Sequence, residues 1–264
     1  MRRSSSSGRS TRIGASAGWL IVDGARLITL VVLAAVATGC ATAERPDPFE
    51  KVNRRIFAFN EGLDRYALEP VAKAWDFVIP GFVQDGIQNF YRNLDMPIVV
   101  ANDLLQAKPV AVVEDVARFF FNSTLGLGGF IDVATRVGIP DNDEDFGQTL
   151  GYWGVGEGYY LVLPVFGPST TRDVWGVPVD SFLLDPVTYV DPLSVRLSIR
   201  GTDVVDKRAN LLRLEKAFGE AQVDPYSFQR QAYLQRRREL TYDGNPPRPK
   251  LEFEEPEAPA PPAQ

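Results

Sequence analysis

The chain has 264 residues, 45% of them hydrophobic, and a formal charge of −6. That length supports one sizeable hydrophobic core, or two. An acidic chain is a poor match for nucleic acid, so we expect no nucleic-acid partner. The sequence contains no histidine and a single cysteine, Cys40. These counts exclude a histidine-dependent catalytic unit, a histidine metal site, an internal disulfide and a thiolate metal cluster.

The first 39 residues are typical of an export signal. Residues 2–26 are rich in Arg, Ser and Gly, and the uncharged apolar run 27–37 is too short to span a bilayer as a helix. Small residues then lead into Cys40, an arrangement that resembles the bacterial lipoprotein signal, in which the cysteine is acylated. Ala41 follows where an aspartate would indicate inner-membrane retention, so an outer-membrane destination is favoured. The alternative is an ordinary secretory signal with an incidental cysteine.

The mature chain begins with a predicted helix. Asp47 is expected to cap it, Pro48 suits the first helical position, and Glu50 would complete a capping box. Apolar residues from Phe49 to Tyr66 then recur every three or four positions, which places them on one helical face. That face predicts either core packing or partial immersion in lipid.

Helical patterns continue through most of the chain. The expected order is a short piece between Pro70 and Pro80, a helix from Gly81 that Met96-Pro97 interrupts and that resumes to Gln106, one over 110–125, one near 171–175, the longest over 195–221, and a last one from Asp224-Pro225 to about Leu240. No mature segment has about twenty continuous apolar residues, so no transmembrane span is expected.

The stretch Thr124–Asp173 mixes glycine with aromatic residues and suits neither a regular helix nor a plain strand. We interpret it as the wall of a cavity or channel, with a short strand at Tyr160–Leu163. Acidic residues at 141–145 lack the ligand alternation of a calcium loop, so a solvated turn is predicted there. The arginines at 236–238 are interpreted as a solvated helix end, or else as a contact for anionic lipid or an acidic partner.

Motifs for nucleotide and ester chemistry fail in this chain. Gly126–Gly129 is followed by neither the Lys of a Walker loop nor the last glycine of a dinucleotide fingerprint. Gly14–Gly18 matches the G-x-S-x-G pattern of a nucleophile elbow, but it lies in the predicted signal peptide, and the chain has no histidine to activate the serine. We therefore expect no enzyme activity, no catalytic residues, no cofactor and no metal.

Composition divides the chain into four parts. They are a signal peptide (1–39), a lipidated linker (40–46), a helical domain (47–243) and a disordered tail rich in proline and glutamate (244–264).

Several motifs together resemble the MlaA/VacJ family of outer-membrane lipoproteins. Asp-Pro-Phe-Glu opens the mature domain, Arg-Phe-Phe-Phe-Asn-Ser-Thr-Leu-Gly-Leu-Gly-Gly follows at its centre, and Leu-Pro-Val-Phe-Gly-Pro-Ser comes later. The matching segments, in the family's order, are 47–60, 118–132, 146–156, 163–173 and 224–233. The resemblance covers roughly residues 46–240, without the acidic tail.

The resemblance implies a mainly α, ring-like bundle of amphipathic helices around a lipid channel, inserted in the outer membrane from the periplasmic side. It implies removal of mislocalised phospholipids from the outer leaflet, association with a porin, and transfer to a periplasmic lipid carrier, which together maintain lipid asymmetry. The alternative is a porin-binding scaffold lipoprotein that moves no lipid. A lipid hydrolase is disfavoured because the chain lacks histidine.

The same resemblance implies that the segment Gly126–Ile139 lines or gates the channel. Its glycines would permit close approach or hinging, and its apolar side chains would form the wall. The candidate residues are Leu127, Gly128, Gly129, Phe130, Ile131 and Val133. Simple packing between helices is the alternative for each of them.

Overall fold

The computed structural model describes residues 47–218 and 224–247. The predicted signal peptide, Cys40 with its linker, and residues 248–264 of the predicted tail lie outside the described residues. So does the end of the helix expected over 195–221.

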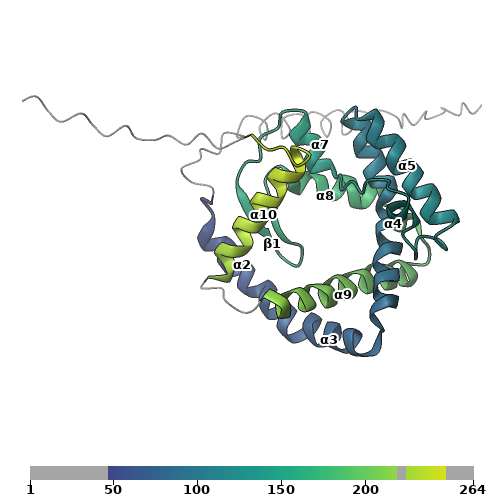
Figure 1. Cartoon of the computed structure of the whole chain (residues 1–264). Coiled ribbons are helices and arrows are strands. Elements are labelled where there is room, and N and C mark those ends of the chain that lie inside the picture. The colour runs from purple at the N-terminus through teal and green to yellow at the C-terminus, as the bar shows by residue number, and fades with distance from the viewer. Residues whose placement is uncertain (1–46, 219–223, 248–264) are drawn as a thin grey trace, which may run out of the picture.

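The described elements close into a ring around a central opening (Figure 1). Their order is α2 (Glu50–Leu63), a π-helical turn (Asp64–Leu68), α3 (Glu69–Val78), α4 (Gly81–Leu105), α5 (Pro109–Thr124), α6 (Val133–Arg136), α7 (Phe146–Tyr152), β1 (Tyr160–Leu163), β2 (Gly167–Thr170), a 3₁₀ turn (Asp173–Trp175), α8 (Gly176–Val179), a second π-helical turn (Asp180–Leu184), a second 3₁₀ turn (Pro186–Tyr189), α9 (Leu193–Phe218) and α10 (Pro225–Thr241). The expected mainly α fold is confirmed.

The strand expected at Tyr160–Leu163 is present as β1, and β2 pairs with it as an antiparallel hairpin. Tyr160 lies opposite Thr170, and Leu163 lies opposite Gly167. Asn53 of α2 holds the hairpin, because its side chain donates to the Tyr160 carbonyl and accepts from the Val162 amide, both at 3.0 Å. The hairpin is thereby fixed against the first helix of the ring.

Helix α10 closes the ring against α2. The Arg54 guanidinium donates to both carboxylate oxygens of Asp224 at 3.2 and 2.7 Å. An apolar cluster of Tyr160, Val162 and Tyr226 is buried between these two helices and β1. Helix α2 and the start of α10 are thus joined by a fork-shaped ion pair beside a small core.

A second apolar cluster joins α3 to α9. Ala72 and Ala209 are fully buried there, with Leu212 beside them and Trp75 packed against the group. Small residues at the contact allow the two helix backbones to approach closely. The Trp75 indole also donates to Asp206 at 2.9 Å, so its polar atom is satisfied.

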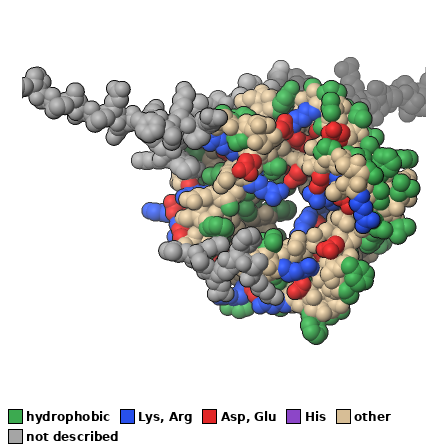
Figure 2. Space-filling model, in the orientation of Figure 1, with side chains coloured by type: hydrophobic (Ala, Val, Ile, Leu, Met, Phe, Trp, Pro, Cys, Tyr) green, Lys and Arg blue, Asp and Glu red, His purple; other side chains and the backbone are tan. Residues whose placement is uncertain are grey.

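Helix α5 has the opposite polarity. Its buried residues are Asp115, Arg118 and Asn122, spaced three and four positions apart on one face. Its exposed residues include Val110 and Phe120, which are 70% and 60% exposed. Apolar side chains gather over the outer side of the ring near α4 and α5 in the space-filling view (Figure 2). Such a helix presents its apolar face outward and its polar face to the protein.

Among the described helices, none combines the length and hydropathy needed to cross a bilayer.

Two local expectations were wrong. Helix α4 runs unbroken through Pro97, because Met96 and Val99 are buried in its packing against the rest of the ring. Tertiary contacts there outweigh the backbone hydrogen bond that proline removes. At α2, Phe49 is the N-cap residue and no side chain caps the helix. Asp47 instead accepts hydrogen bonds from Asn53 and Tyr226, so its carboxylate joins α2 to α10.

Candidate functional site

The helices are arranged around a central opening (Figure 1). Helix α9 forms one wall of two cavities. Arg200, Asp203 and Lys207 lie on one stripe of α9, at spacings of three and four. Val204 and Leu211 lie on the neighbouring stripe. Val204 and Leu211 come four residues after Arg200 and Lys207, so they lie about one turn further along the helix and only about 40° around it. Helix α9 therefore contributes neighbouring positions to a charged cavity and to an apolar recess.

The α4–α9 cavity is the charged side. It has a volume of about 310 Å³ and is lined by residues of α4, the acidic loop, the second π-helical turn and α9. Arg200 pairs with Asp185 at 2.7 Å, and Lys207 pairs with Asp203 at 2.9 Å. In the space-filling view, basic and acidic side chains border the opening on the side of α4 and α9 (Figure 2). This cavity suits polar or charged groups.

Two further carboxyl groups face this cavity, and their surroundings change their protonation. Burial raises the pKa of Asp95 to about 6, against the lowering effect of the Lys207 charge. Burial also raises the pKa of Asp180 to about 6, although Asp180 accepts from the Phe146 amide and from Asn102. The negative charge of the cavity therefore grows as the pH rises through about 6.

The α2–α9 recess is the apolar side, with a volume of about 590 Å³. Residues of α2, the first π-helical turn, α3, the hairpin and α9 line it. Most of the side chains there are aliphatic or aromatic, and several are solvent-exposed in the concave surface. The large exposed ones are Leu63, Val71, Val165, Val204 and Leu211, whereas Phe57 is half-buried.

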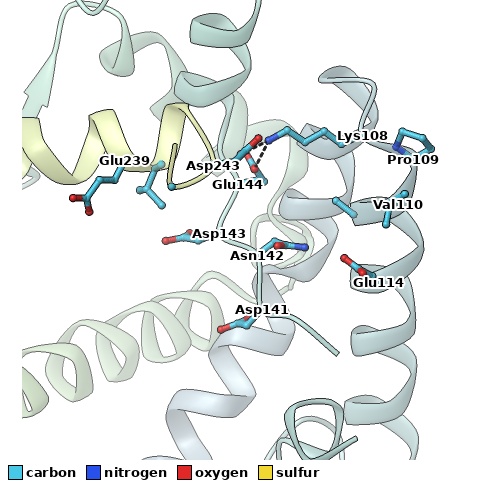
Figure 3. Close-up of a pocket in the computed structure, with 13 residues that line it drawn as sticks. Lys108, Pro109, Val110, Glu114, Asp141, Asn142, Asp143, Glu144, Glu239 and Asp243 are labelled. Atoms are coloured by element: carbon cyan, nitrogen blue, oxygen red, sulfur yellow. Dashed lines mark hydrogen bonds and ion pairs between the residues drawn. The ribbon is translucent and has the colours of Figure 1, made fainter. Parts of the chain in front are cut away.

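A third cavity of about 620 Å³ lies where α10 ends and α5 begins (Figure 3). Lys108 points between two carboxylates there, and its ammonium donates to Glu144 at 2.8 Å and to Asp243 at 2.6 Å. Glu114, Asp141 and Glu239 add further acidic groups around the cavity. Lys108 thus ties the acidic loop and the end of α10 to the start of α5.

The interpretation of the acidic loop as a solvated turn was wrong for Glu144 and Asp145, which connect elements of the ring, whereas Asp141 and Asp143 are exposed. Glu144 is only 7% exposed, because Lys108 and Gln106 hold its carboxylate. Asp145 caps α7 by accepting from the Gln148 amide at 2.9 Å. The sequence shows several carboxylates in a row, but their cations come from distant helices and only the fold brings them together.

The arginine run at the end of α10 contains one buried member. Arg237 donates to Asp145 and to Asp173, each at 3.0 Å, so it is an internal tie and not a solvated end. Burial alone would raise the pKa of Asp173, but the charges of Arg237 and Arg172 hold it below its usual value. Tyr233 also donates to Asp173 at 2.8 Å. This network joins α10 to α7 across the top of the ring in Figure 1.

The six candidate gate residues lie on the segment after α5, where it folds back against α4. Leu127 is 73% exposed, whereas Phe130 stacks on Phe90 of α4 with ring centroids 5.2 Å apart. Gly129 has a φ of +100°, and a Cβ placed there would come within 2.6 Å of Asn93. Gly128 also has a positive φ, and Ile131 and Val133 are half-buried. None of the six lines the α4–α9 cavity or the α2–α9 recess.

Polar side chains of α5 clamp this segment. The Arg118 guanidinium donates to Asp132 at 3.0 Å and to the Ile139 carbonyl at 3.0 Å, and it is 1% exposed. The Asn122 side chain accepts from the Val133 and Ala134 amides at 2.8 and 2.9 Å. The segment is therefore held in one conformation by hydrogen bonds to the buried face of α5.

Comparison with known proteins places this ring in a family. The family model described as "MlaA lipoprotein" matches residues 45–240. The chain belongs to the MlaA lipoprotein family. It is 38% identical over 223 residues to the Escherichia coli protein named "Intermembrane phospholipid transport system lipoprotein MlaA", covering 80% of this chain and 86% of the relative. A Haemophilus influenzae protein of the same name is 36% identical over 231 residues, covering 83% of this chain and 91% of the relative.

A solved structure supports the same placement. It comes from work described as "Structural basis for maintenance of bacterial outer membrane lipid asymmetry". The match has a TM-score of 0.63 at 36% identity, and it covers 76% of this chain and all of the other. The ring-shaped fold of this MlaA-family chain is thus shared with a solved relative.

Reasoning from the sequence missed the residues that line the opening. Asp95 and the stripe of Arg200, Asp203 and Lys207 carry no recognisable motif. The available signal was the helical spacing of charges within a long helix whose neighbouring positions are apolar. That spacing indicates a charged and an apolar set of positions on α9, but it does not show which other helices face them.

Proposed function

We propose that this MlaA-family chain removes mislocalised phospholipids from the outer leaflet of the outer membrane and passes them to a periplasmic carrier. This transfer maintains the lipid asymmetry of the membrane. The observation that carries the proposal is the distribution of polarity. Apolar side chains cover the outside of the ring near α4 and α5, and the opening holds a charged cavity beside an apolar recess.

A phospholipid needs an apolar path for its acyl chains and a polar path for its headgroup. Helix α9 contributes residues to both kinds of surface. Moving a lipid breaks no covalent bond, so the task requires shaped surfaces and no nucleophile or metal. The family relatives named for intermembrane phospholipid transport support this assignment.

The proposed setting is the outer membrane, entered from the periplasmic side. Acylation at Cys40 would anchor the chain, and the outward apolar faces of α3 and α5 would lie among lipid tails. Phe77 on α3 is 91% exposed and Val113 on α5 is 68% exposed, which is costly in water and favourable in lipid. A porin would hold the ring in the membrane, and a soluble carrier would collect the lipid.

We further propose that the segment Gly126–Ile139 gates access to the ring from its outer edge. Leu127 and Phe130 offer exposed apolar surface beside α4, and the glycines at 128 and 129 carry positive φ values. Arg118 and Asn122 fix the segment at its base, so any opening motion would be confined to the exposed turn around Leu127.

Deletion of the gene tests the proposed function. Phospholipid should appear in the outer leaflet, and the cells should become sensitive to detergent, because surface phospholipid weakens the permeability barrier. Surface lipid is measured by its accessibility to an added phospholipase, and the gene supplied in trans should restore the wild-type level. Unchanged surface phospholipid would contradict transport; porin co-purification in that case would indicate a scaffold.

A Cys40→Ala variant tests the anchor. It should incorporate no labelled fatty acid and should fractionate away from the outer membrane. Labelling equal to that of the wild type would show that acylation at Cys40 is the wrong assignment.

A further inference from the structure

The α2–α9 recess and the α4–α9 cavity differ in polarity, and a phospholipid has parts that match each of them. We propose that the α2–α9 recess binds an acyl chain of a phospholipid whose headgroup faces the α4–α9 cavity. This inference rests on the proposed function and assigns a binding site to it.

The recess has the size and lining of an organic ligand site. Its volume of about 590 Å³ lies within the range of about 300–1,000 Å³ that is typical of such sites. Leu63, Val71 and Leu211 are between 41% and 51% exposed, although they lie in a concave surface. Apolar side chains left exposed in a concavity gain free energy when an apolar ligand covers them.

The charged residues of the recess are already paired with one another. Arg208 donates to both carboxylate oxygens of Asp64 at 2.8 and 2.7 Å, and it pairs with Glu215 at 3.1 Å. The guanidinium is therefore engaged on two sides, with 13% of its side chain exposed. A headgroup phosphate would have to displace these carboxylates, so the recess favours the uncharged part of the lipid.

The hairpin tip supplies an independent observation. Val165 has a φ of +71°, which is strained for a β-branched residue and unstrained for glycine. Asn60 of α2 stabilises this conformation, because its side chain donates to the Leu163 carbonyl at 2.9 Å and accepts from the Val165 amide at 2.8 Å. The strained turn places an aliphatic side chain, 68% exposed, at the rim of the recess.

The charged cavity lies against the neighbouring stripe of α9 and offers the complementary surface. Asp203 directly precedes Val204, and Lys207 directly precedes Arg208, so the two environments share one helix. The two cations of this cavity, Arg200 and Lys207, are paired with Asp185 and Asp203, and further carboxylates outnumber them. The cavity therefore suits the ammonium of a zwitterionic head whose acyl chain lies in the recess. A soluble ion would occupy only the charged cavity, and the anionic head of a fatty acid would meet mostly carboxylates there.

Photolabelling tests the assignment. Purified full-length protein in detergent is mixed with phosphatidylethanolamine that carries a diazirine either on an acyl chain or on the headgroup, and the labelled peptides are identified by mass spectrometry. The acyl label should map to α2, α3 and α9 peptides that contain Leu63, Val71 or Leu211. The headgroup label should map to peptides that contain Asp95 or Asp180. Acyl adducts confined to 126–139, or an exchanged pattern, would overturn the proposal.

Matched substitutions sharpen the test. Leu211 and Leu214 lie on the same helix with 47% and 48% exposure, but only Leu211 lines the recess. Leu211→Trp should remove most of the acyl adduct, and Leu214→Trp should leave it unchanged. Val71→Trp and Val78→Trp form a second such pair on α3. If Leu211→Trp does not accumulate, Val165→Gly removes apolar surface without added bulk and should also lower the adduct.

The two proposals fail in different ways. Suppose that gene deletion exposes phospholipid, but that the Leu211→Trp and Leu214→Trp variants give the same acyl adduct and restore the deletion strain equally well. The recess assignment is then wrong, and the transport function stands. If deletion leaves surface phospholipid unchanged, the transport function is wrong, whatever the labelling pattern. If the Leu211→Trp variant loses the acyl adduct and also fails to restore the deletion strain, both the recess assignment and the transport function are supported.

Discussion

Two helix contacts hold opposite sides of the ring together by opposite means. The α4–α5 contact buries the polar residues Asp103, Asp115 and Arg118, and the outer face of α5 is apolar. The α3–α9 contact buries Ala72 and Ala209, and α9 turns charged residues toward the opening. The buried contact of α5 is polar and its outer face is apolar. The buried contact of α9 is apolar and its residues in the α4–α9 cavity are charged.

This difference has a physical reason. Apolar packing drives association where water is the competing solvent, and it loses that advantage where lipid tails compete. Hydrogen bonds and ion pairs between helices keep their value in lipid, because an unpaired polar group there is costly. The polar contact behind α5 would therefore keep its strength if the apolar outer face of this helix lies in lipid, as proposed.

Removal of Arg118 should have the largest effect on the polar contact. Arg118→Met retains much of the volume but leaves Asp132 and Asp141 without a buried cation. We expect a loss of about 3–5 kcal/mol in the free energy of unfolding, the usual consequence of breaking a buried ion pair. Urea titration in detergent, followed by circular dichroism, measures it. The control Arg236→Met, at a side chain 71% exposed, should cost less than about 1 kcal/mol. Equal losses would contradict the special role of the contact.

Truncation in the apolar contact should come next. Leu212 is 6% exposed in the α3–α9 cluster, and Leu212→Ala should cost about 2–3 kcal/mol by removing buried surface and leaving a cavity. Leu214→Ala, at a position 48% exposed on the same helix, should change the free energy of unfolding by no more than about 0.5 kcal/mol. The same titration compares the two. A Leu212→Ala cost as small as that of Leu214→Ala would show that this cluster does not hold α3 to α9.

Glycine substitutions probe how tightly the candidate gate packs on α4. Both Gly128 and Gly129 have positive φ values, but only an added Cβ at Gly129 meets a neighbour, Asn93. We expect Gly129→Ala to lower the free energy of unfolding by about 1–3 kcal/mol more than Gly128→Ala. Both variants carry the strain of an alanine at positive φ, but only Gly129→Ala adds a clash with a neighbour. Thermal unfolding in detergent measures the difference. Equal values would mean that Asn93 moves aside freely.

The smallest effect is a pH dependence of the polar contact. Burial, together with the neighbouring Asp115 carboxylate, raises the pKa of Asp103 well above its usual range. The folded protein then holds a proton that the unfolded chain releases, so this stability is fully present below about pH 4 and is lost as the pH rises through the raised pKa. Asp103→Asn should flatten this fall in denaturant titrations between about pH 5 and about pH 9.

Asp191→Asn is the matched control, since its side chain is 89% exposed. It should leave the slope unchanged. A slope in Asp103→Asn equal to that of the wild type would show that another group carries the pH dependence.

The elements of the ring were largely predictable from local patterns. The helix over 110–125, the strand at Tyr160–Leu163 and the helix that begins at Asp224-Pro225 lie where periodicity and proline placed them. Pro97 was misread, because the buried contacts around it are absent from any local window. The hairpin partner β2 was also missed, since four residues containing glycine and proline carry little strand signal.

Long-range pairing was hidden from the sequence. Asp145 and Arg237 lie 92 positions apart, and Arg54 and Asp224 lie 170 apart. Several acidic residues in a row are predicted to be solvent-exposed unless the fold shows which cations pair with them. For the same reason, the charged wall of the opening was not identified, and attention fell on the glycine-rich segment instead.

The sequence alone determined the amphipathic helices, the absence of histidine chemistry and the family motifs, because each depends on residues close together or on simple counts. Only the tertiary structure decided which faces point outward and which meet in the opening. Helix α9 shows why. Its charges and aliphatic residues are interleaved along the chain, and they separate into two environments only when α2, α3 and α4 are placed around it.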